Sequence, residues 1–211
     1  MYVEDIQPGT PDRLLVEGYD TEQVDMMSEK VILVDQQDRV LGSMSKVDAH
    51  RGEGVLHRAF SILLFDENGR LLLQKRASHK ITFPDVWANT VCSHPLHIPA
   101  EINIMPLGEG SKIAAIRKMK QELGIPVGTI QPENIHFITR MMYRARADDV
   151  WVEHELDHIL FARAPKEMPM DVNPNEISDV CWVSKSELEE WVSGNTSRDK
   201  VIAPWFRLIA E

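Results

Sequence analysis

The sequence predicts a single domain of the mixed α/β (α+β) class, with a mixed β-sheet sandwich flanked by helices. The length of 211 residues is that of one ordinary globular domain. The composition, 43% hydrophobic and 27% charged, is typical of a chain that buries a core. The expected elements run in the order strands, helix, strands, helix and are joined by hairpins, whereas a doubly wound fold would alternate strands with crossover helices.

The first half of the chain is predicted to hold an arm, four strands and a long loop. Residues 1–28 are acidic and lack periodicity, so we expect an arm attached to a domain over residues 29–211. Strands are predicted at VILVD and VLGSMSK. His57–Phe65 alternates, and the Asn68–Gly69 turn returns the chain through RLLLQKR, which indicates a hairpin. Residues 77–110 show no sustained period, which is typical of a functional loop.

The second half is predicted to hold a long helix, three strands and two short helices. Ser111–Leu123 has an apolar residue at every third or fourth position and is followed by Gly124, a stop signal. Ser184 and Glu187 are spaced as a capping box for a helix that ends at Val192. The remaining elements are strands over residues 135–144, 150–163 and 177–183 and a last helix over residues 205–209.

The charge and the cysteine count limit the possible partners and compartments. With 23 Lys+Arg against 33 Asp+Glu, the formal net charge of −10 argues against a nucleic-acid partner. No apolar run reaches the roughly 18 residues of a membrane span, and the acidic start lacks the features of a signal peptide. Two cysteines are too few for a disulfide framework. We therefore expect a soluble cytoplasmic protein without membrane or nucleic-acid partners, and we favour a monomer.

Two carboxylates and three histidines form a candidate metal site. In a strand over WVEHELDHIL, Glu153 and Glu155 point to the same face. This face is either the solvated side of an edge strand or a buried acidic pair that needs a cation. Together with His50, His57 and His94, the pair would form a five-ligand site suited to zinc, manganese or magnesium. Spacing alone leaves both interpretations open.

The two cysteines require different interpretations. Cys92 lies in NTVCSHP, two residues before His94, and is either an inert buried thiol or an acid or base beside a metal site. Cys181 lies inside the apolar segment VCWV, and we assign it to the core.

The basic residues near the expected loop also have two interpretations. Arg76, Lys80 and Lys46 are either solvated surface charges or, if they converge, an anion site suited to phosphates. Lys118 and Glu122 have the spacing of a helical surface pair worth about 0.2–0.5 kcal/mol. Their alternative role is to hold an anion and its metal.

Six motifs occur together in a specific order over about residues 30–209. They are HRAFS at His57, QKRASHKITFPDVWANTVCSHPL from Gln74, RKMKQELGI from Arg117, YRARADDVWVEHELDHIL from Tyr143, NPNEI at Asn173 and APWF at Ala203. With them the chain resembles the type I isopentenyl-diphosphate Δ-isomerases of eukaryotic type, a branch of the Nudix-like fold. The resemblance implies a metal-dependent isomerase that interconverts isopentenyl and dimethylallyl diphosphate through a tertiary carbocation and feeds isoprenoid biosynthesis.

The resemblance also implies a role for each matching position. Cys92 and Glu155 match the two reacting groups, Tyr143 a tyrosine that supports the catalytic carboxylate, and Trp205 an aromatic ring that meets the hydrocarbon. We expect the Glu155 and Tyr143 side to donate the proton in the forward direction and Cys92 to accept one.

Two cation sites are implied in the same way. The residues of the first metal site are His50, His57, His94, Glu153 and Glu155, which would hold Mg²⁺, Mn²⁺ or Zn²⁺. The basic positions that hold the diphosphate are Lys46, Arg76, Lys80 and Lys118. Glu122 matches the carboxylate that helps to bind the Mg²⁺ of the substrate diphosphate.

Helix residues 117–124 depart from the pattern of Nudix hydrolases. Aligned with the hydrolase box, Lys118 and Gln121 stand where carboxylates collect the hydrolytic magnesium. The missing negative charge argues against activation of water by a metal cluster. Two alternatives to the isomerase remain at this point, a Nudix-type diphosphohydrolase and a non-catalytic module that binds divalent metals.

Overall fold

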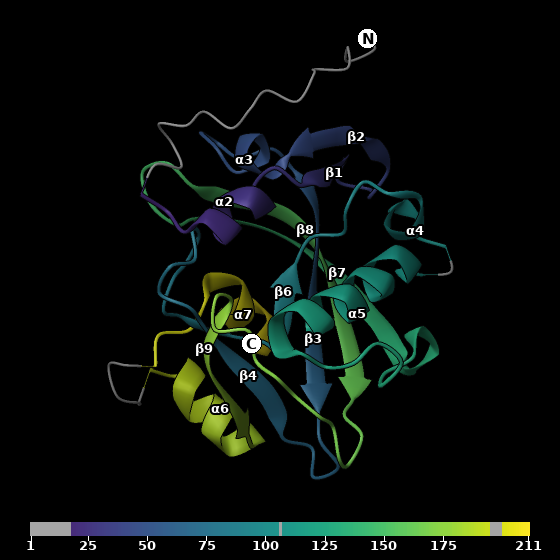
Figure 1. The fold of residues 1–211 in the computed structure, drawn as a ribbon, viewed down its shortest axis with the longest axis vertical. Helices are drawn as coiled ribbons and strands as arrows, with labels where there is room; N and C mark the ends of the chain where they lie inside the picture. Colours follow the sequence, from purple (N-terminus) through teal and green to yellow (C-terminus); the bar gives the residue numbers. More distant parts are fainter. Residues whose placement is uncertain (1–17, 106, 195–199) are drawn as a thin grey trace.

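The computed structural model describes residues 18–105, 107–194 and 200–211 (Figure 1). Within these residues, nine strands form one curled, mixed sheet. The strands are β1 (Lys30–Val34), β2 (Val40–Ser45), β3 (His57–Phe65), β4 (Leu71–Arg76), β5 (Trp87–Ala88), β6 (Val91–Ser93), β7 (Ile135–Arg146), β8 (Val152–Arg163) and β9 (Ile177–Val183).

The helices flank this sheet. They are α2 (Thr21–Met26), α3 (Lys46–Ala49), α4 (Pro99–Ile102), α5 (Glu109–Leu123), α6 (Lys185–Val192) and α7 (Pro204–Ala210), together with the short 3₁₀ helix η1 (Pro132–Asn134). Within the described residues, none combines the length and the apolar character that a bilayer span requires. The mixed α/β class expected from the sequence is confirmed.

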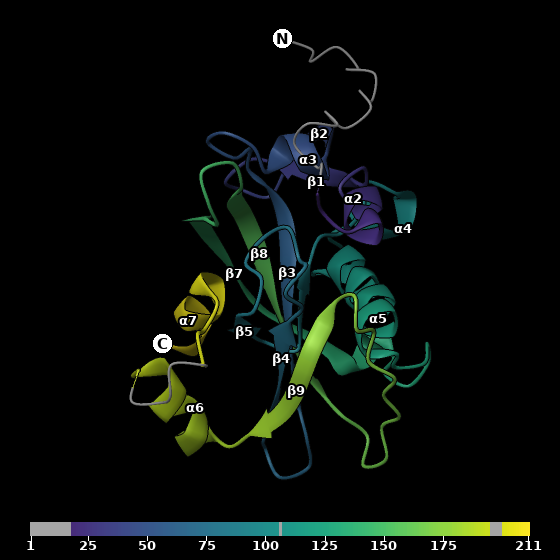
Figure 2. The ribbon, with the colours of Figure 1, turned by 60° about the vertical axis from the view of Figure 1, so that its left-hand side comes forward.

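The centre of the sheet is β3, which makes both parallel and antiparallel pairs. It runs parallel to β8 from the pair His57–Glu155 to the pair Phe65–Arg163, and antiparallel to β1 and β6. The predicted hairpin of β3 and β4 is confirmed at the pair Phe65–Leu71. From there β4 turns away to pair with β5 and β9, so the sheet divides into two parts (Figure 2).

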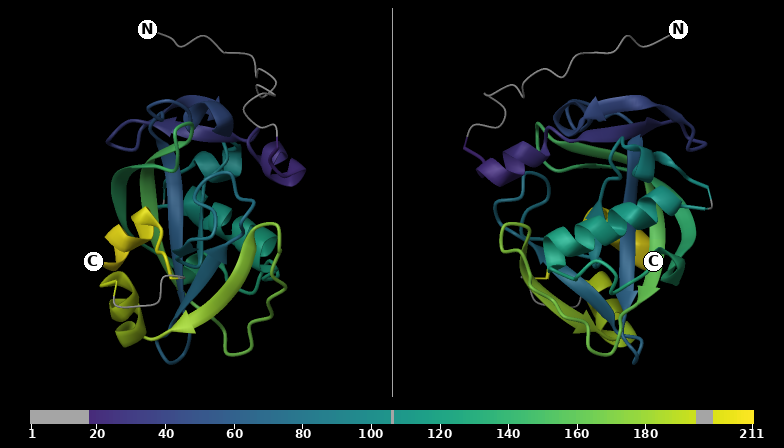
Figure 3. Two further views of the ribbon diagram at one scale, coloured as in Figure 1. Left: turned by 90° about the vertical axis from the view of Figure 1, so that its left-hand side faces the viewer. Right: turned by 45° about the vertical axis from the view of Figure 1, so that its right-hand side comes forward.

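Two apolar cores lie on opposite faces of the sheet. One lies between the sheet and α5, and Phe60, Leu72 and Met119 belong to it. The other lies between the sheet and the helices α6 and α7, and Trp191 and Phe206 belong to it. Figure 3 shows α5 on one side of the sheet and α6 with α7 on the other. The layered arrangement encloses β3 and β8, the strands that carry the predicted site.

Helix α5 follows the sequence prediction closely. It begins at Glu109, two residues before the predicted start, and ends at Leu123. Gly124 has a left-handed conformation, with φ of 65°, and a Cβ atom there would lie 2.2 Å from the carbonyl oxygen of Asp171. Glycine is therefore required both by the backbone angle and by the close approach of the chain. The capping box of α6, formed by Ser184 and Glu187, is also confirmed.

A buried polar network fixes β8 against its neighbours. Asp38, in the turn between β1 and β2, accepts hydrogen bonds from Arg58 Nε at 2.7 Å and His158 Nε2 at 2.8 Å. The other ring nitrogen of His158 lies 2.9 Å from Ser111 Oγ on α5. The buried Arg58 guanidinium and Asp38 carboxylate are thus paired with each other, as burial of a charge requires. The network ties the first hairpin and α5 to the strand that carries Glu155.

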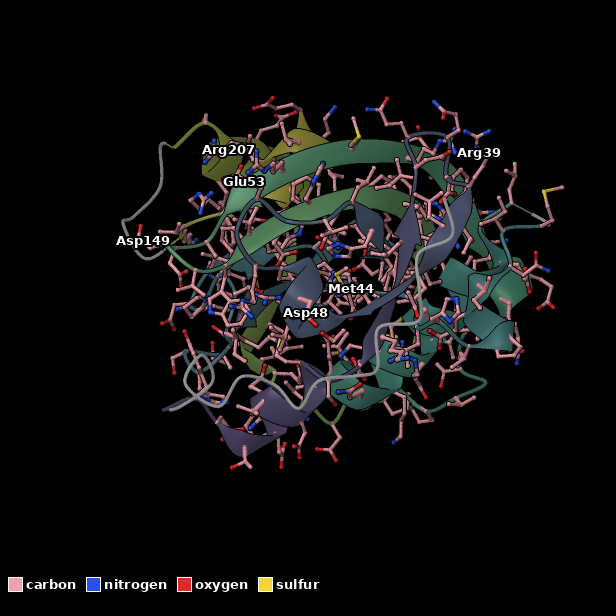
Figure 4. The ribbon with its side chains drawn as sticks, turned by 90° about the horizontal axis from the view of Figure 1, so that it is seen from above. Arg39, Met44, Asp48, Glu53, Asp149 and Arg207 are labelled. Carbon is pink, nitrogen blue, oxygen red and sulfur yellow. The ribbon has the colours of Figure 1, made fainter. Side chains whose placement is uncertain are left out.

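The first hairpin and α3 lie across the end of the sheet at which β3 begins. Figure 4 shows them from above, with Met44 of β2 and Asp48 of α3 near the centre of the view and Glu53 beside β7. Glu53 forms ion pairs with Arg144 and Arg146 of β7. Of the expected arm, residues 1–17 lie outside the described residues, whereas Thr21–Met26 form α2. Gln23 of α2 donates a 2.6 Å hydrogen bond to Asn175 Oδ1.

Candidate active site

The acidic face of β8 is buried within the sheet. Glu153, Glu155 and Asp157 alternate along the strand, and each is less than a tenth exposed. Because β8 lies between β3 and β7, it is not an edge strand. The interpretation of these carboxylates as a solvated edge is therefore wrong, and each needs a compensating group.

Three histidines reach the same point from three segments of the chain. His57 begins β3 and pairs in parallel register with Glu155. His50 follows α3, and the chain returns to β3 through Gly52 and Gly54, whose φ angles of 62° and 70° suit glycine. His94 directly follows β6. The three ring centroids lie 4.6–5.0 Å apart.

The imidazole nitrogens face the two carboxylates. His94 Nε2 lies 2.7 Å and His57 Nε2 3.7 Å from Glu155 Oε1, and His50 Nε2 lies 3.9 Å from Glu153 Oε2. One candidate ligand atom from each of His50, His57, His94 and Glu155 lies within 4.8 Å of the others. Within the described residues, His50 Nε2, His57 Nε2 and His94 Nδ1 are buried without a hydrogen-bond partner. Such orphaned nitrogens fit a bound divalent cation.

The outer ring nitrogens hold two of the imidazoles in a fixed orientation. His50 Nδ1 lies 2.8 Å from the carbonyl oxygen of Lys46, and His57 Nδ1 lies 2.7 Å from that of Val55. A proton on Nδ1 leaves the lone pair of Nε2 facing the carboxylates. Burial lowers the pKa of His57 to about 3, lowers that of His50, and places that of His94 well below its usual value. All three imidazoles are thus neutral at pH 7, the form that binds metals.

Glu155 has different neighbours at its two carboxylate oxygens. Oε1 faces the histidines, whereas Oε2 accepts a 2.5 Å hydrogen bond from the hydroxyl of Tyr143 on β7. Burial and the adjacent Glu153 carboxylate raise the pKa of Glu155 well above its usual value. Burial likewise raises the pKa of Tyr143. Tyr143 and the histidines thus contact different oxygens of the Glu155 carboxyl, and burial favours its protonated form.

Cys92 lies on β6 against a buried arginine. Its Sγ lies 3.8 Å from Arg76 Nη1. Burial raises the pKa of the Cys92 thiol to about 12, and the charge of Arg76 opposes this increase. The guanidinium is held by the carbonyl oxygens of Thr82, at 2.7 Å from Nη2, and Phe83, at 2.9 Å from Nε. Phe83 adopts a φ of 47°, which is uncommon for a residue other than glycine.

Trp205, near the start of α7, is placed beside the same groups. It is 2% exposed, and its Nε1 donates a 3.2 Å hydrogen bond to Asn89 Oδ1. The Phe83 ring meets it edge-on at a centroid distance of 5.3 Å, and the Tyr143 ring lies 6.3 Å away. The guanidinium carbon of Arg76 is 5.7 Å from the Trp205 ring. Arg76, expected to hold only a diphosphate, therefore also contacts Cys92 and Trp205.

Two of the other basic residues, Lys80 and Lys118, are paired with buried carboxylates. Lys80 Nζ lies 2.5 Å from Glu176 Oε2, and Lys118 Nζ lies 3.2 Å from Glu122 Oε1. Lys118 and Glu122 are both buried, so their interpretation as a surface pair is wrong. A single cavity collects most of the predicted residues. It is lined by Lys46, Arg76, Lys80, Thr82, Cys92, Ser93, His94, Lys118, Glu122, Tyr143, Glu153, Glu155 and Trp205.

The structure adds residues that the sequence reasoning did not select. Thr82 and Ser93 line the cavity, and Glu176 pairs with Lys80 from behind. Thr82 lies inside the motif QKRASHKITFPDVWANTVCSHPL and Glu176 inside NPNEI, so the motifs marked these segments without indicating the role of either residue. Cys181 is only partly buried and packs against the core beside α6 and α7.

Comparisons with known proteins place the chain among relatives of one activity. A family model described as NUDIX domain matches residues 55–206. The chain is 44% identical over 196 residues to isopentenyl-diphosphate Delta-isomerase 1 of Bos taurus, covering 91% of this chain and 85% of the relative. It is 47% identical over 208 residues to the isopentenyl-diphosphate delta-isomerase of Aspergillus fumigatus, covering 91% and 72%.

Solved structures support the fold alone. A protein of Deinococcus radiodurans superposes with a TM-score of 0.60 at 18% identity, over 86% of this chain and 97% of that one. A NUDIX hydrolase from Alicyclobacillus acidocaldarius superposes with a TM-score of 0.54 at 9% identity, over 72% and 88%. At these identities the neighbours carry no information on activity.

Proposed function

This chain belongs to the isopentenyl-diphosphate Δ-isomerases built on a NUDIX domain, and we propose that it interconverts isopentenyl diphosphate and dimethylallyl diphosphate. The observation that carries the proposal is the shared cavity of two proton-transfer groups from different strands. Cys92 comes from β6. Glu155 comes from β8 and accepts a hydrogen bond from the Tyr143 hydroxyl. A double bond that moves by one carbon needs one group to donate a proton and another to accept one.

The proposed reaction requires two proton transfers. The Glu155 and Tyr143 side protonates C4 of isopentenyl diphosphate, and the positive charge develops at the tertiary carbon C3. Cys92, which must enter this step as the thiolate, then removes a proton from C2, the C2–C3 double bond forms, and the product is dimethylallyl diphosphate. The 2.5 Å hydrogen bond between the Tyr143 hydroxyl and Glu155 Oε2 supports a proton donor on this side of the cavity. The Arg76 guanidinium, 3.8 Å from Cys92 Sγ, favours negative charge on the acceptor. The roles reverse in the back reaction.

Aromatic side chains protect the proposed intermediate. A carbocation reacts with any water that reaches it, so the hydrocarbon needs a dry site. Trp205 and Tyr143 are both less than a tenth exposed and line the cavity. The face of a desolvated indole ring stabilises a cation by about 2 kcal/mol or more.

The buried group of His50, His57, His94 and Glu155 is compatible with a divalent metal, and we propose these four residues as its ligands, with Glu153, whose Oε2 lies 3.9 Å from His50 Nε2, as the fifth. When bound, the metal would supply positive charge that balances the buried carboxylates. Imidazole ligands favour a transition metal such as Zn²⁺ or Mn²⁺ over Mg²⁺. The orphaned nitrogens support this assignment.

We propose that the diphosphate occupies the basic side of the cavity, where Lys46, Arg76, Lys80 and Lys118 supply charge and hydrogen bonds. Glu122, beside Lys118, would help to hold the accompanying Mg²⁺. The Lys118 ammonium and the Gln121 amide occupy positions where a hydrolase places carboxylates. This substitution favours the isomerase over a diphosphohydrolase. The cytoplasmic location and the monomeric state stay predictions from composition.

Product analysis tests the proposal directly. Purified protein is incubated with isopentenyl diphosphate and magnesium in deuterium oxide, with and without a chelator. We expect dimethylallyl diphosphate that carries deuterium from the solvent, and loss of turnover after chelation. Release of phosphate without isomerisation would support the hydrolase. Metal binding without deuterium incorporation would support a non-catalytic module.

A further inference from the structure

Glu176 is a buried acid next to the cavity that the proposed reaction does not use. It precedes β9 in the segment NPNEI, and its side chain is 1% exposed. Its Oε2 accepts the 2.5 Å hydrogen bond from Lys80 Nζ. Within the described residues, this carboxylate is the one side chain that accepts a hydrogen bond from the Lys80 ammonium. Lys80 lines the cavity and Glu176 does not. The carboxylate therefore contacts the ammonium from outside the cavity lining.

The backbone on both sides of Glu176 is firmly held. Its carbonyl oxygen accepts a 3.0 Å hydrogen bond from the amide of Ala77, and its own amide donates a 3.0 Å hydrogen bond to the carbonyl oxygen of Asn173. The neighbouring Asn175 accepts two hydrogen bonds from Gln23 of α2, at 2.6 and 3.1 Å. These contacts fix the carboxylate relative to the segment that carries Lys80.

Gln121 of α5 makes a second contact with the carboxylate. Its Nε2 lies 3.4 Å from Glu176 Oε1, the carboxylate oxygen that Lys80 does not engage, and 3.1 Å from Met26 Sδ. An amide at this position can donate to Glu176, whereas a carboxylate would place two like charges at the distance of a hydrogen bond. The residue type at position 121 is therefore matched to an ionised Glu176.

The charge state of Lys80 depends on the negative charge of Glu176. Burial, together with the charges of Arg76 and Lys118, lowers the pKa of Lys80 to about 8, although the charges of Glu176 and Glu122 raise it. Burial tends to raise the pKa of Glu176, but Lys80 and Lys118 outweigh it and lower that pKa to about 2. Without the Glu176 charge, Lys80 would lose its proton at a lower pH than it does now.

We propose that Glu176 is a positioning residue for the diphosphate, which acts by keeping the Lys80 ammonium charged and directed into the cavity. The inference rests on the proposed function in one respect, because it takes the ligand of the four basic residues to be a diphosphate. An ammonium has three N–H donors. Glu176 engages one of them, and the others remain for diphosphate oxygens.

The test compares the pH dependence of anion binding in Glu176→Gln and in the wild type. The probe is inorganic diphosphate with excess magnesium, titrated calorimetrically into the full chain at a pH of about 6 and a pH of about 8. Both proteins keep Lys80 charged at the lower pH, whereas only the wild type retains much of this charge at the higher pH. We expect the ratio of the variant Kd to the wild-type Kd to rise about tenfold between them, the effect of losing one charge-assisted contact.

Two further variants separate this role from a general loss of structure. Glu176→Asp keeps the charge and should restore most of the wild-type pH dependence. Glu189→Gln removes a carboxylate whose side chain is 66% exposed, and its Kd ratio should stay constant with pH. A fold defect would weaken binding equally at both pH values, and that result would overturn the proposal.

A double-mutant cycle makes the test independent of the stability of Glu176→Gln. In a Lys80→Met background no ammonium remains to be positioned, and Lys80→Met/Glu176→Gln contains no uncompensated charge from this pair. Adding Glu176→Gln should then leave the pH dependence of Kd unchanged. If its effect persisted without Lys80, or if Glu176→Gln bound the probe more tightly at both pH values, the inference would be wrong. Wild-type turnover of isopentenyl diphosphate, measured separately, reports on the proposed function itself.

Discussion

The hydroxyl of Tyr143 donates a 2.5 Å hydrogen bond to Oε2 of Glu155, while Oε1 of the same carboxylate lies 2.7 Å from His94 Nε2. One oxygen is thus directed to the candidate metal group and the other to a phenol that lines the cavity. Metal binding and proton transfer can therefore use different atoms of a single side chain. The pairing of Tyr143 with Glu155 across β7 and β8 sets this arrangement.

Tyr143→Phe removes the hydrogen bond and keeps the ring. We expect kcat to fall by about ten- to a hundredfold, because the proton-transfer carboxyl loses the donor that orients it. The metal content should stay at the wild-type level, since Oε1 still faces the histidines. Steady-state kinetics and metal analysis on the same preparation check both parts. A variant that lost metal and activity together would show that Tyr143 acts through the metal site.

Cys92→Ala and Glu155→Gln each remove a proposed proton-transfer group. Turnover should fall by several orders of magnitude in each variant. The circular dichroism spectrum of Cys92→Ala should stay native, because the substitution removes one sulfur atom from a partly buried site. Near wild-type isomerisation by purified Cys92→Ala would exclude the proposed pair of acid and base.

Alanine at His50, His57 or His94 should release the metal of the histidine site. In the proposed site three neutral imidazoles supply the nitrogen ligands, so loss of one would leave the coordination incomplete. Metal analysis after extensive dialysis measures the effect. His136→Ala, which changes an exposed histidine on β7, is the matched control and should retain the metal. Full retention in all three site variants would mean that the ligands are assigned wrongly.

The buried carboxyl of Asp157 should make the free energy of unfolding depend on pH. Burial raises its pKa from 3.8 to about 8, despite the hydrogen bond from Ser61. Because the pKa in the folded state exceeds that in the unfolded state, its contribution to stability is fully present below about pH 3.8 and is lost as the pH rises through about 8. Asp157→Asn removes the ionisation while keeping the volume.

The free energy of unfolding of Asp157→Asn should therefore depend less on pH than that of the wild type. Relative to the wild type, the variant should be more stable at a pH near 8 than at a pH near 5. Urea unfolding of both proteins at the two pH values, with the metal content matched, measures the difference. Parallel pH profiles would show that Asp157 does not change its protonation on unfolding in this range.

Local patterns predicted the regular elements well. The apolar period gave α5 within two residues of its start, and the capping box gave α6. The alternation in β8 placed Glu153 and Glu155 on one face. The same patterns could not predict α3 and α4, of four residues each, or the two-residue β5, because such short segments contain too little periodicity.

The contacts of the site depend on pairings that the spacing of residues does not contain. His57 meets Glu155 because β3 and β8 are parallel neighbours, and this pairing joins residues almost a hundred positions apart. The contact of Arg76 with Cys92 depends on the carbonyl oxygens of Thr82 and Phe83, and Phe83 has a positive φ that sequence preferences disfavour. The resemblance to known isomerases named these residues, but only the fold gives their partners.

Substitutions of the cavity residues should separate effects on substrate binding from effects on the chemical step. We place Lys80 and Lys118 on the proposed diphosphate side of the cavity, where charge does not change as the double bond moves, so they should bind the ground and transition states alike. Their alanine variants should mainly raise KM. Trp205 should face charge that exists only along the reaction path, so Trp205→Phe should mainly lower kcat and Trp205→Ala should lower it further.

Arg76→Ala should affect both parameters, because the guanidinium lies 3.8 Å from Cys92 Sγ and 5.7 Å from the Trp205 ring and also lines the cavity where we propose that the diphosphate binds. Its loss removes charge from the diphosphate and the positive neighbour of the proton acceptor, so KM should rise and kcat should fall. Steady-state kinetics of the alanine variants decides between the roles. If Lys80→Ala lowered kcat at constant KM while Trp205→Ala changed only KM, the diphosphate and hydrocarbon ends of the cavity would be exchanged. If Arg76→Ala raised KM alone, its contact with Cys92 would have no part in the chemistry.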